Sequence, residues 1–429
     1  MKTLYDKFLK SSGVTTDSRN VEKNQMFFAL KGELFDGNKF AQNALEKGAS
    51  CAVIDDNRFM TDDRCVLVEN VQETLVNLAK WHRQQLHCPV VAITGSNGKT
   101  TTKELVVKVL QSKHIVTYTK GNLNNHIGLP LTILTANKNT KILIVEMGAN
   151  HQGEIDFLSN IAKPHYALIT NIGKAHLEGF GSPESVFKTK TELYNYVIDN
   201  GTGIIVNADD VKLVKAAGNK ICITYGTNSG NIQSEIISNV PFLNFRWSYN
   251  GSDYEQQTQL FGAYNIYNAL AAVAAGIHFQ VQPDDIVQAI AEYQPQNNRS
   301  QFVLTHNNNS VILDAYNANP SSMNLALEEF FLMEGKPKYA IIGEMKELGK
   351  FGKEEHLAVL EKLRNAHLEA VMLVGNEFKC FEEQFSGFIF FNNSNDLYEH
   401  LKLKQDLHDS YIIIKGSRAN ALEKIIDLL

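Results

Sequence analysis

The sequence predicts an α/β protein with three domains, and three observations lead to this prediction. The chain has 429 residues, which at roughly 100–200 residues per domain is too long for one hydrophobic core. Short apolar runs alternate with stretches of helical periodicity along most of the chain, as they do in α/β folds. A Cys88-Pro89 pair marks a linker, and a second series of apolar runs follows residue 298. The expected domains are residues 1–86, 87–298 and 299–429.

Composition and charge exclude several classes of protein. The formal net charge is −6, so the chain has no overall basic field and a nucleic-acid partner is not expected. Its 5 cysteines are scattered without a C-x-x-C pair, which argues against a disulfide framework or a zinc site and favours the reducing cytoplasm. The first residues form no apolar signal region, and no run approaches the ~18 apolar residues of a membrane span. Membrane insertion is therefore not expected.

The N-terminal segment is expected to form a small α/β unit. Strands are predicted at 26–30, 51–54 and 65–68, and helices at 40–47 and 71–86. A polar stretch, Thr16-Asp17-Ser18-Arg19, precedes the first of these strands. Ser18 and Arg19 could donate hydrogen bonds to a phosphate or a uronic-type anion, although a plain polar turn explains the same residues.

The central segment is organised around residues 94–102, with the sequence TGSNGKTTT. An apolar run precedes this stretch and a helical pattern follows it, which is the strand–turn–helix arrangement that binds phosphate through backbone N–H groups and a helix N-terminus. Lys99 is expected to reach the outer phosphates and Thr100 to offer its hydroxyl to magnesium. Ile93 stands where the common spacing has a glycine, so the motif is a shortened variant. The expected triphosphate contacts are Gly95, Ser96, Asn97, Gly98, Lys99, Thr100 and Thr101.

Polar residues also follow other apolar runs of the central segment. Glu146 is a candidate magnesium ligand beside the phosphate loop, because ligands bind at the carboxyl ends of strands in open α/β sheets; a surface glutamate is the alternative. His176 is a candidate metal ligand, although a lone histidine is more often a hydrogen-bonded polar residue. An Asn250-Gly251 turn flanked by residues 242–249 and 255–261 predicts a hairpin, and hence a mixed sheet. Asn268, one turn into an alanine-rich helix, could contact an adenine edge or be solvated.

The C-terminal segment is expected to form a second, Rossmann-like doubly wound sheet. Its predicted strands lie at 311–313, 339–343, 371–374 and 411–414, with helical stretches between them. Polar residues again follow these runs, among them Asp314 and Lys415. Two sheets with polar strand ends predict a cleft between domains that closes on substrates.

Taken together, these stretches resemble the Mur ligase family of peptidoglycan synthesis over almost the whole chain. Residues 94–101 are similar to the family's ATP loop, and Glu146 and His176 fall where the family places magnesium ligands. Lys190, in the stretch KTKTEL, resembles the lysine that family members carry as a carbamate. Without the resemblance, Lys190 would be interpreted as a solvated helix lysine. Carbon dioxide added to a neutral amine gives an anion, which can hold a cation where an ammonium would repel it.

Within the family, residues 314–323 (DAYNANPSSM) are most similar to members that add D-alanyl-D-alanine. The stretches at 16–19 and 343–349 (GEMKELG) resemble the same members. Relatives that add one amino acid, and folylpolyglutamate synthetases, carry a histidine-containing variant of the first motif. Two residues depart from the family pattern, since Asn38 and Tyr264 stand where histidine is frequent. The departure at Asn38 affects an expected contact with the uridine, and the departure at Tyr264 affects the expected packing around the nucleotide.

The resemblance implies ATP-dependent amide formation through an acyl phosphate, by a chain that acts as a monomer. The implied substrates are UDP-N-acetylmuramoyl-tripeptide and D-alanyl-D-alanine. One Mg²⁺ is expected near Thr100 and Glu146, and a second near His176 and carbamoylated Lys190. Lys99, His176 and Lys190 are accordingly the expected catalytic residues. The third residue of the tripeptide, lysine or diaminopimelate, stays open.

The remaining site residues implied by the resemblance are divided among three ligands. Asn268, Arg299 and Asp314 are expected at the adenosine and phosphates, although an arginine between domains is as often a salt-bridge partner. Ser18 and Arg19 are expected at the UDP end of the substrate, in residues 1–86. The region expected near the incoming dipeptide comprises Asn317, Asn319, Lys415, Ser417 and Arg418.

Three other functions remain as hypotheses at this point. The first is another amino-acid ligase of the same family, such as the tripeptide-forming enzyme or a folate-type ligase. The second is a nucleotide-dependent switch or a UDP-sugar binding module, which would need no second metal position. The third is an inactive homologue, against which the intact set of Lys99, Glu146, His176 and Lys190 argues.

Overall fold

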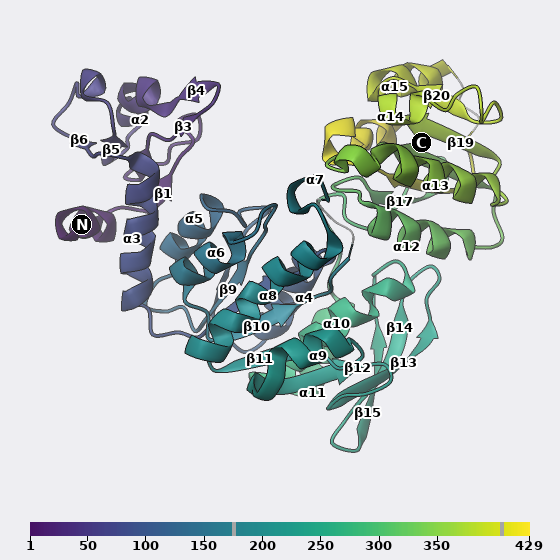
Figure 1. Cartoon of the computed structure of the whole chain (residues 1–429), viewed down its shortest axis with the longest axis horizontal. Helices are drawn as coiled ribbons and strands as arrows, with labels where there is room; N and C mark the ends of the chain where they lie inside the picture. The colour runs from purple at the N-terminus through teal and green to yellow at the C-terminus, as the bar shows by residue number, and fades with distance from the viewer. Residues whose placement is uncertain (174–176, 404–406) are drawn as a thin grey trace.

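The structure is a computed structural model that describes residues 1–173, 177–403 and 407–429 of the chain. The described part contains a four-stranded, a nine-stranded and a six-stranded sheet, together with a two-stranded hairpin. The three larger sheets follow one another along the sequence, and the N-terminal and C-terminal regions lie on either side of the central one (Figure 1). The predicted α/β architecture of successive sheets is confirmed.

The N-terminal sheet is parallel, in the order β1-β2-β5-β6. Its strands are β1 (Val14–Thr15), β2 (Met26–Phe28), β5 (Cys51–Ile54) and β6 (Cys65–Leu67), and the hairpin is β3 (Lys31–Gly32) with β4 (Phe35–Asp36). The helices are α1 (Lys2–Lys10), α2 (Ala41–Glu46) and α3 (Val71–Gln85). The three predicted strands are present, and the two-residue strand β1 was too short for its pattern to be recognised.

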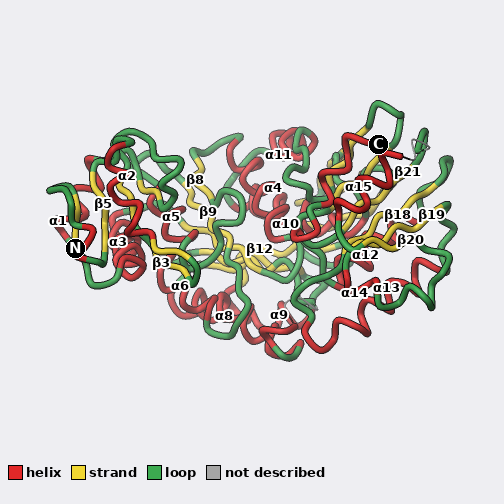
Figure 2. The backbone as a smooth tube through the Cα atoms, turned by 90° about the horizontal axis from the view of Figure 1, so that it is seen from above, coloured by secondary structure: helices red, strands yellow, loops and turns green. Residues whose placement is uncertain are grey.

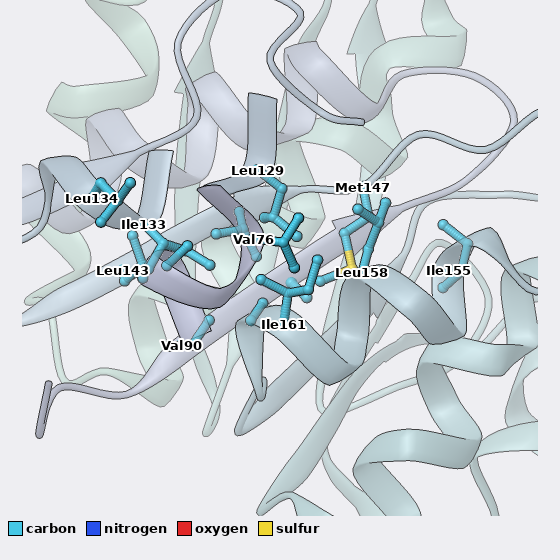
Figure 3. Packing of buried hydrophobic residues seen from close by; sticks show 14 of the residues in the cluster. Val76, Val90, Leu129, Ile133, Leu134, Leu143, Met147, Ile155, Leu158 and Ile161 are labelled. Atoms are coloured by element: carbon cyan, nitrogen blue, oxygen red, sulfur yellow. The ribbon is translucent and has the colours of Figure 1, made fainter. Parts of the chain in front are cut away.

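Helix α3 joins the N-terminal region to the central one through a shared apolar core. Val76 of α3 lies among Leu129 and Ile133 of α5 (Gly128–Thr135) and Ile161 of α6 (Glu154–Ala162) (Figure 3). Burying such side chains contributes about 25 cal/mol per Å² of apolar surface, so the two regions are packed together rather than connected by a free linker.

The nine-stranded central sheet has the order β15-β14-β13-β12-β11-β10-β7-β9-β8. Its strands are β7 (Val90–Thr94), β8 (Val116–Tyr118), β9 (Ile142–Glu146), β10 (Tyr166–Ile169), β11 (Gly203–Asn207), β12 (Ile221–Gly226), β13 (Ile232–Ser238), β14 (Asn244–Tyr249) and β15 (Ser252–Gln257). β14 pairs antiparallel with both β13 and β15, which confirms the predicted mixed sheet. Asn250 and Gly251 join β14 to β15 with φ values of 50° and 80°, as a two-residue hairpin turn requires.

Helices cover both faces of the central sheet, and Figure 2 shows the strands running between them. The helices are α4 (Lys99–Gln111), α5 (Gly128–Thr135), α6 (Glu154–Ala162), α7 (Leu177–Phe180), α8 (Pro183–Asn200), α9 (Val211–Ala217), α10 (Ile266–His278) and α11 (Pro283–Ala291). Alternate residues of β7 enter opposite cores, since Val90 and Ala92 pack in one cluster and Val91 and Ile93 in the other. The alanine-rich α10 lies so close to α4 that a Cβ on Gly276 would come within 2.7 Å of Val109 Cγ1.

The C-terminal sheet has the order β16-β17-β21-β18-β19-β20 and is parallel except for the edge strand β16. Its strands are β16 (Gln301–Leu304), β17 (Ser310–Asp314), β18 (Lys338–Gly343), β19 (Ala370–Val374), β20 (Ile389–Phe391) and β21 (Tyr411–Lys415). The helices are α12 (Pro320–Phe331), α13 (Gly352–Arg364), α14 (Asn376–Lys379) and α15 (Ser394–Leu403). Apolar cores lie on both faces, as a doubly wound sheet requires. The chain closes with a 3₁₀ segment, Leu422–Leu428.

None of the helices in the described residues is both long and apolar enough to cross a membrane.

Candidate active site

A cavity of about 840 Å³ lies between the central and C-terminal sheets. The central region lines it with the phosphate loop, Glu146 and Asn268, and the C-terminal region with Arg299, Asp314 and Lys415. The phosphate loop, Glu146, Asp314 and Lys415 lie at or directly after the carboxyl ends of strands in two sheets, which is where ligands bind in open α/β folds. The cavity therefore brings together the two sets of polar strand ends that the sequence pointed to.

Two glycines give the phosphate loop its shape. Gly95 has a φ of +146°, and a Cβ there would come within 2.0 Å of Thr170 Oγ1. Gly98 has a φ of +73°, and a Cβ there would come within 2.5 Å of Asn268 Oδ1. Both positions combine a left-handed backbone with a close approach, so a side chain would displace the loop. Gly95 supports the loop from behind, whereas Ser96 to Thr101 line the cavity.

Hydrogen bonds from the end of β10 hold the loop in place. The Asn97 backbone N–H donates to Asn171 Oδ1 (3.0 Å), and Thr170 Oγ1 donates to the Asn97 carbonyl (2.6 Å). The Ser96 backbone N–H donates to the Asn171 carbonyl (2.9 Å), and Ser96 Oγ accepts from the Gly173 N–H (2.9 Å). Thr170 and Asn171 were not among the predicted site residues; their position directly after an apolar run was the signal that could have identified them.

Lys99 starts helix α4 and points back over the loop. Its Nζ donates to the carbonyls of Gly95 (2.7 Å) and Ser96 (3.0 Å). Burial and, to a smaller extent, the Arg299 charge lower the pKa of Lys99 to about 8, against the opposing effect of the Glu146 carboxylate. The ammonium is thus held by loop carbonyls at the place where phosphate oxygens would bind.

Glu146, at the end of β9, carries a buried and unsatisfied carboxylate oxygen. The side chain is 1% exposed, and its Oε1 accepts from Asn124 Nδ2 (2.7 Å). Its Oε2 has no hydrogen-bond partner among the described residues. A buried anionic oxygen without a partner is costly, and a bound cation removes that cost. Thr100, which is 4% exposed, lines the same cavity.

Within the described ranges, no group of three or more His, Cys, Asp or Glu side chains is arranged to hold a metal ion. A cation beside Glu146 therefore needs other oxygens, such as those of Thr100, phosphate and water. The predicted ligand His176 lies outside the described residues.

Lys190 lies on α8 and is buried rather than solvated. It is 1% exposed, with its Nζ 3.5 Å from the Ala149 carbonyl and 5.6 Å from the centre of the Phe180 ring. Burial, together with the positive charge of Lys99, lowers the pKa of Lys190 to about 7. The interpretation of Lys190 as a solvated helix lysine is therefore wrong.

Asn268 and Tyr264 form the part of the cavity expected to hold the nucleoside. Asn268 Oδ1 accepts from Thr102 Oγ1 (2.9 Å), and its Nδ2 donates to Asn265 Oδ1 (2.8 Å). Tyr264 replaces the frequent family histidine, lines the cavity and shares a 3.0 Å hydrogen bond with Ser300 Oγ. Burial raises the pKa of its phenol well above the ordinary range, so this tyrosine stays neutral.

The C-terminal wall of the cavity is built from side-chain pairs. The Arg299 guanidinium lies 3.7 Å from the centre of the Tyr316 ring, and Arg418 lies 5.1 Å from it. Lys415, which is 1% exposed, pairs with Asp314. Asp314 also accepts from the Ser300 N–H (3.2 Å). Tyr316 was not among the predicted site residues.

The residues predicted near the dipeptide fall into two groups. Asn317, Asn319 and Lys415 line the cavity. Ser417 is not among the residues described as lining it, because its hydroxyl accepts from the Lys346 N–H (3.0 Å) inside the C-terminal region. Arg418 is exposed and reaches only the Tyr316 ring among the contacts described.

The residues predicted at the UDP end lie in the N-terminal region, outside this cavity. Arg19 is exposed and donates to both carboxylate oxygens of Asp17 at 2.9 Å. The guanidinium lowers the pKa of Asp17 to about 2. Asn38, the other departure from the family pattern, is buried, and its Nδ2 donates to Asp36 (2.8 Å) and Asp55 (2.9 Å).

Several other polar residues line the cavity without having been predicted. Each comes from the end of a strand, from a loop that follows a strand or from the first turn of a helix, and they are Asn124, Asn125, His126, Asn150, Asn207, Asp210, Tyr267 and Ser321. Their signal in the sequence is weak because a polar residue after an apolar run is common in any α/β protein.

The fold and the cavity define a P-loop nucleotide-binding protein whose site is completed by a second doubly wound sheet. Comparison with known proteins refines that class. Family models match along the chain as the Mur ligase family catalytic domain (residues 10–92), the Mur ligase middle domain (93–276) and the Mur ligase glutamate ligase domain (298–418). The chain belongs to the Mur ligase family.

Individual relatives agree with this assignment. UDP-N-acetylmuramoyl-tripeptide--D-alanyl-D-alanine ligase of Bacillus subtilis is 34% identical, over 96% of this chain and 92% of the relative. The ligase of the same name from Escherichia coli is 33% identical, over 97% and 93%. The crystal structure of MurF from Acinetobacter baumannii superposes with a TM-score of 0.84 at 30% identity, covering 96% of this chain and 92% of that one. The crystal structure of MurF ligase from Thermotoga maritima in complex with ADP also superposes with a TM-score of 0.84. It is 27% identical and covers 98% of this chain and 97% of that one.

Proposed function

We propose that this chain joins D-alanyl-D-alanine to UDP-N-acetylmuramoyl-tripeptide at the expense of ATP. The observation that carries the proposal is the cavity of about 840 Å³ with a phosphate loop on one wall and Arg299, Asp314 and Lys415 on the other. The curated relatives matched along the full chain are ligases of this name. ATP use is supported by the structural relative that binds ADP.

The reaction balances as two transfers. The carboxylate of the tripeptide attacks the γ-phosphorus of ATP, the bond to the β-phosphate oxygen breaks, and ADP leaves behind an acyl phosphate. The dipeptide amine then attacks the acyl carbon, loses a proton, and inorganic phosphate leaves. The first step brings two anions together, so positioning and charge neutralisation dominate it. Lys99 and the loop N–H groups bind the outer phosphates, and Arg299 opposes the charge on the transferring group.

Glu146 and Thr100 are proposed to hold a Mg²⁺ ion. Two observations support a Mg²⁺ ion here. The buried Glu146 Oε2 receives no hydrogen bond from any described residue, and Glu146 and Thr100 offer the oxygen ligands that Mg²⁺ prefers. When bound, the ion supplies charge neutralisation to the β- and γ-phosphates. Asn124, which donates to Glu146 Oε1, orients the carboxylate.

Lys190 is proposed to carry a carbamate that holds a second Mg²⁺ together with His176. Carbamate formation requires a neutral amine, which adds to carbon dioxide and releases a proton. Support comes from the burial of Lys190, 1% exposed, and from its position beside the Ala149 carbonyl rather than a carboxylate among the contacts described.

The remaining roles follow the regional division of the chain. Residues 1–86 are proposed as the domain for the UDP end of the substrate, with Ser18 and Arg19, residues 87–298 as the ATP domain, and residues 299–429 as the domain for the dipeptide. Asn317 and Lys415 line the cavity and are placed for the dipeptide. We further propose a monomer, and a location in the cytoplasm, where the 5 cysteines would stay the free thiols that they are here.

The test is phosphate release from ATP, followed by mass spectrometry of the UDP-linked product. Release that requires both the tripeptide substrate and D-alanyl-D-alanine, with a UDP-linked pentapeptide as product, supports the proposal. Both the lysine and the diaminopimelate tripeptides should be offered. Release with single amino acids in place of the dipeptide would instead assign another ligase of the family, and no release with any acceptor would contradict ligation.

Lys190 has its own test. Lys190→Ala should lose at least about 100-fold in rate, the scale expected when one group that stabilises transition-state charge is removed. Acetate or formate added to this variant should restore part of the activity, and depletion of bicarbonate should slow the wild type. Lys188→Ala, an exposed neighbour on the same helix, is the matched control and should retain activity. An equal loss in both variants would contradict the carbamate.

A further inference from the structure

Among the described contacts between the C-terminal region and the central region, two zones differ in chemistry. The first is mainly apolar: Phe242 packs edge-to-face on Phe302 with ring centres 5.1 Å apart, and the fully buried Phe261 belongs to the C-terminal core. Asn239 adds a 2.7 Å hydrogen bond to Glu329 of α12. Apolar burial of this kind persists with or without a ligand. The second zone lies at the phosphate loop and is polar.

In the second zone, one side-chain pair joins the loop to the C-terminal region. Asn319 Nδ2 donates to Asn97 Oδ1 at 2.7 Å. Among the hydrogen bonds of the described residues, this is the one that crosses from the phosphate loop to the C-terminal wall. A single neutral hydrogen bond is weak enough to form and break during turnover.

The direction of this hydrogen bond is fixed by a helix cap. Asn319 is the N-cap of α12, and its Oδ1 accepts from the Ser322 N–H (2.9 Å), while Ser322 Oγ accepts from the Asn319 N–H (3.1 Å). Because the cap uses the amide oxygen, the amide nitrogen must face Asn97. Asn319 is 8% exposed, so the arrangement is also shielded from water.

Asn97 is held equally firmly from the other side. Its backbone N–H donates to Asn171 Oδ1, and its carbonyl accepts from Thr170 Oγ1 (2.6 Å) and Asn171 Nδ2 (3.0 Å). A continuous chain of hydrogen bonds therefore runs from the end of β10 through the phosphate loop to the first turn of α12.

We propose that Asn319 is a positioning residue that seats the C-terminal wall of the cavity against the phosphate loop through Asn97. Arg299, Asp314 and Lys415 belong to that wall, and Arg299 opposes the charge on the transferring phosphoryl group only when the wall is seated. The inference rests on the proposed function. Asn319 thereby receives a role in domain positioning in place of the expected contact with the dipeptide. Its amide oxygen already accepts the hydrogen bond of the helix cap, and one amide N–H already donates to Asn97 of the phosphate loop.

The consequence is a loss of rate rather than of nucleotide affinity. The phosphate loop, Glu146 and Asn268 are all in the central region, so ATP binds there without the pair. Removing the pair leaves the transferring group without a correctly placed C-terminal wall, and small misplacements of catalytic groups are costly in rate. The expected effect is a fall of about 10-fold in kcat with KM for ATP changed by less than about twofold.

The decisive variant is Asn319→Ser. Serine caps a helix N-terminus about as well as asparagine, but it is too short to reach Asn97, so thermal stability should be retained while kcat falls. Asn97→Ala removes the acceptor from the other side. Both single variants should lose the same factor in kcat, and the double variant should lose no more than either one, as a double-mutant cycle requires for a coupled pair. Asn324→Ser, an exposed asparagine on the same helix, is the matched control and should keep the wild-type kcat.

Two outcomes would overturn the proposal. An unchanged kcat in Asn319→Ser removes the positioning role outright. A raised KM for D-alanyl-D-alanine in Asn319→Ser, additive with the loss in Asn97→Ala, assigns Asn319 to the dipeptide instead.

Small-angle scattering separates this inference from the proposed function. With a non-hydrolysable ATP analogue bound, Asn319→Ser should have a larger radius of gyration than the wild type. If the wild-type chain forms no ligation product, the proposed function is contradicted. The scattering experiment then tests by itself whether the hydrogen bond between Asn97 and Asn319 positions the C-terminal region. Superimposable scattering curves for the wild type and Asn319→Ser would then overturn the positioning role of Asn319.

Discussion

The two walls of the cavity are built by different means. The central wall is a backbone construction, in which Gly95 and Gly98 take left-handed conformations and residues at the end of β10 bond the loop through main-chain groups. The C-terminal wall is a side-chain construction, in which Lys415 pairs with Asp314 and Tyr316 supports Arg299. The first wall is shaped by two glycines within one short loop and held by the end of a single neighbouring strand, whereas the buried ion pair of the second wall joins Asp314 and Lys415, which are 101 positions apart.

The largest effect is expected from Gly98→Ala, which breaks the central wall. A Cβ at this position meets Asn268 Oδ1 at 2.5 Å in a left-handed backbone with φ of +73°. The loop must move, and displacing a phosphate-binding loop by about 1 Å costs on the order of 100-fold in kcat/KM for ATP. Steady-state kinetics at varied ATP concentration measures this.

The control for Gly98 is Gly121→Ala. Gly121 has a similar φ of +56°, but a Cβ there meets nothing within 4 Å. Strain from φ alone costs about 1–2 kcal/mol and should lower thermal stability without changing kcat/KM for ATP. Equal kinetic losses in both variants would mean that the close approach to Asn268 is irrelevant.

Lys415→Met tests the side-chain wall. The substitution leaves the Asp314 carboxylate without the buried ammonium that it pairs with. Removing one partner of a buried pair costs about 3 kcal/mol of unfolding free energy, measurable by urea denaturation. Adding Asp314→Asn should recover part of that loss, because the second substitution removes the uncompensated charge. A double variant less stable than Lys415→Met would contradict the pairing.

The same contrast explains what the sequence could predict of the fold. The strands β7, β9, β10 and β11 follow from continuous apolar runs, because buried parallel strands carry apolar residues on both faces. β12 and β13 were not predicted, since runs such as Ile221–Gly226 and Ile232–Ser238 mix exposed and buried positions. β8 has three residues, which is too few for any period to emerge.

The site divides in the same way. The phosphate loop could be predicted because its geometry is local: Gly95, Gly98 and Lys99 lie within five consecutive residues. The stacking of Arg299 and Arg418 on Tyr316 could not, because it joins three segments that only the folded sheet brings together. Neither could the pair between Asn97 and Asn319, which are 222 positions apart.

Tyr316 offers a smaller and sharper test of the C-terminal wall. Tyr316→Leu removes the ring over which Arg299 lies at 3.7 Å, and a cation–π contact of about 1 kcal/mol corresponds to roughly a fivefold loss of kcat/KM. Tyr316→Phe keeps the ring and should keep the activity. If Tyr316→Phe loses as much as Tyr316→Leu, the hydroxyl rather than the stacking holds the arginine.

The smallest effect concerns pH and a buried histidine behind the C-terminal wall. His356 Nε2 accepts from the Met345 N–H (3.0 Å), so the proton of the neutral ring lies on Nδ1, which faces the Gly352 carbonyl at 2.6 Å. Burial lowers the pKa of His356. Protonation would place a donor against the Met345 N–H and loosen the turn at 343–349.

The sign of the effect follows from proton linkage. Because the pKa is lower in the folded state, the unfolded chain binds more protons as the pH falls below about 6.5. The contribution of neutral His356 is therefore fully present above that pH and is lost progressively below it. Glu344 and Glu377 raise the pKa of His356 and Lys346 lowers it, without reversing the direction set by burial.

The measurement compares thermal unfolding at pH 7.5 and 5.5 in the wild type and in His356→Gln. Glutamine can accept from Met345 and donate to Gly352, yet it does not titrate in this range. The variant should therefore lose less of its thermal stability between the two pH values than the wild type does, while the other titrating groups contribute equally to both. An identical pH dependence in the two proteins would show that His356 is not the titrating group behind the side-chain wall.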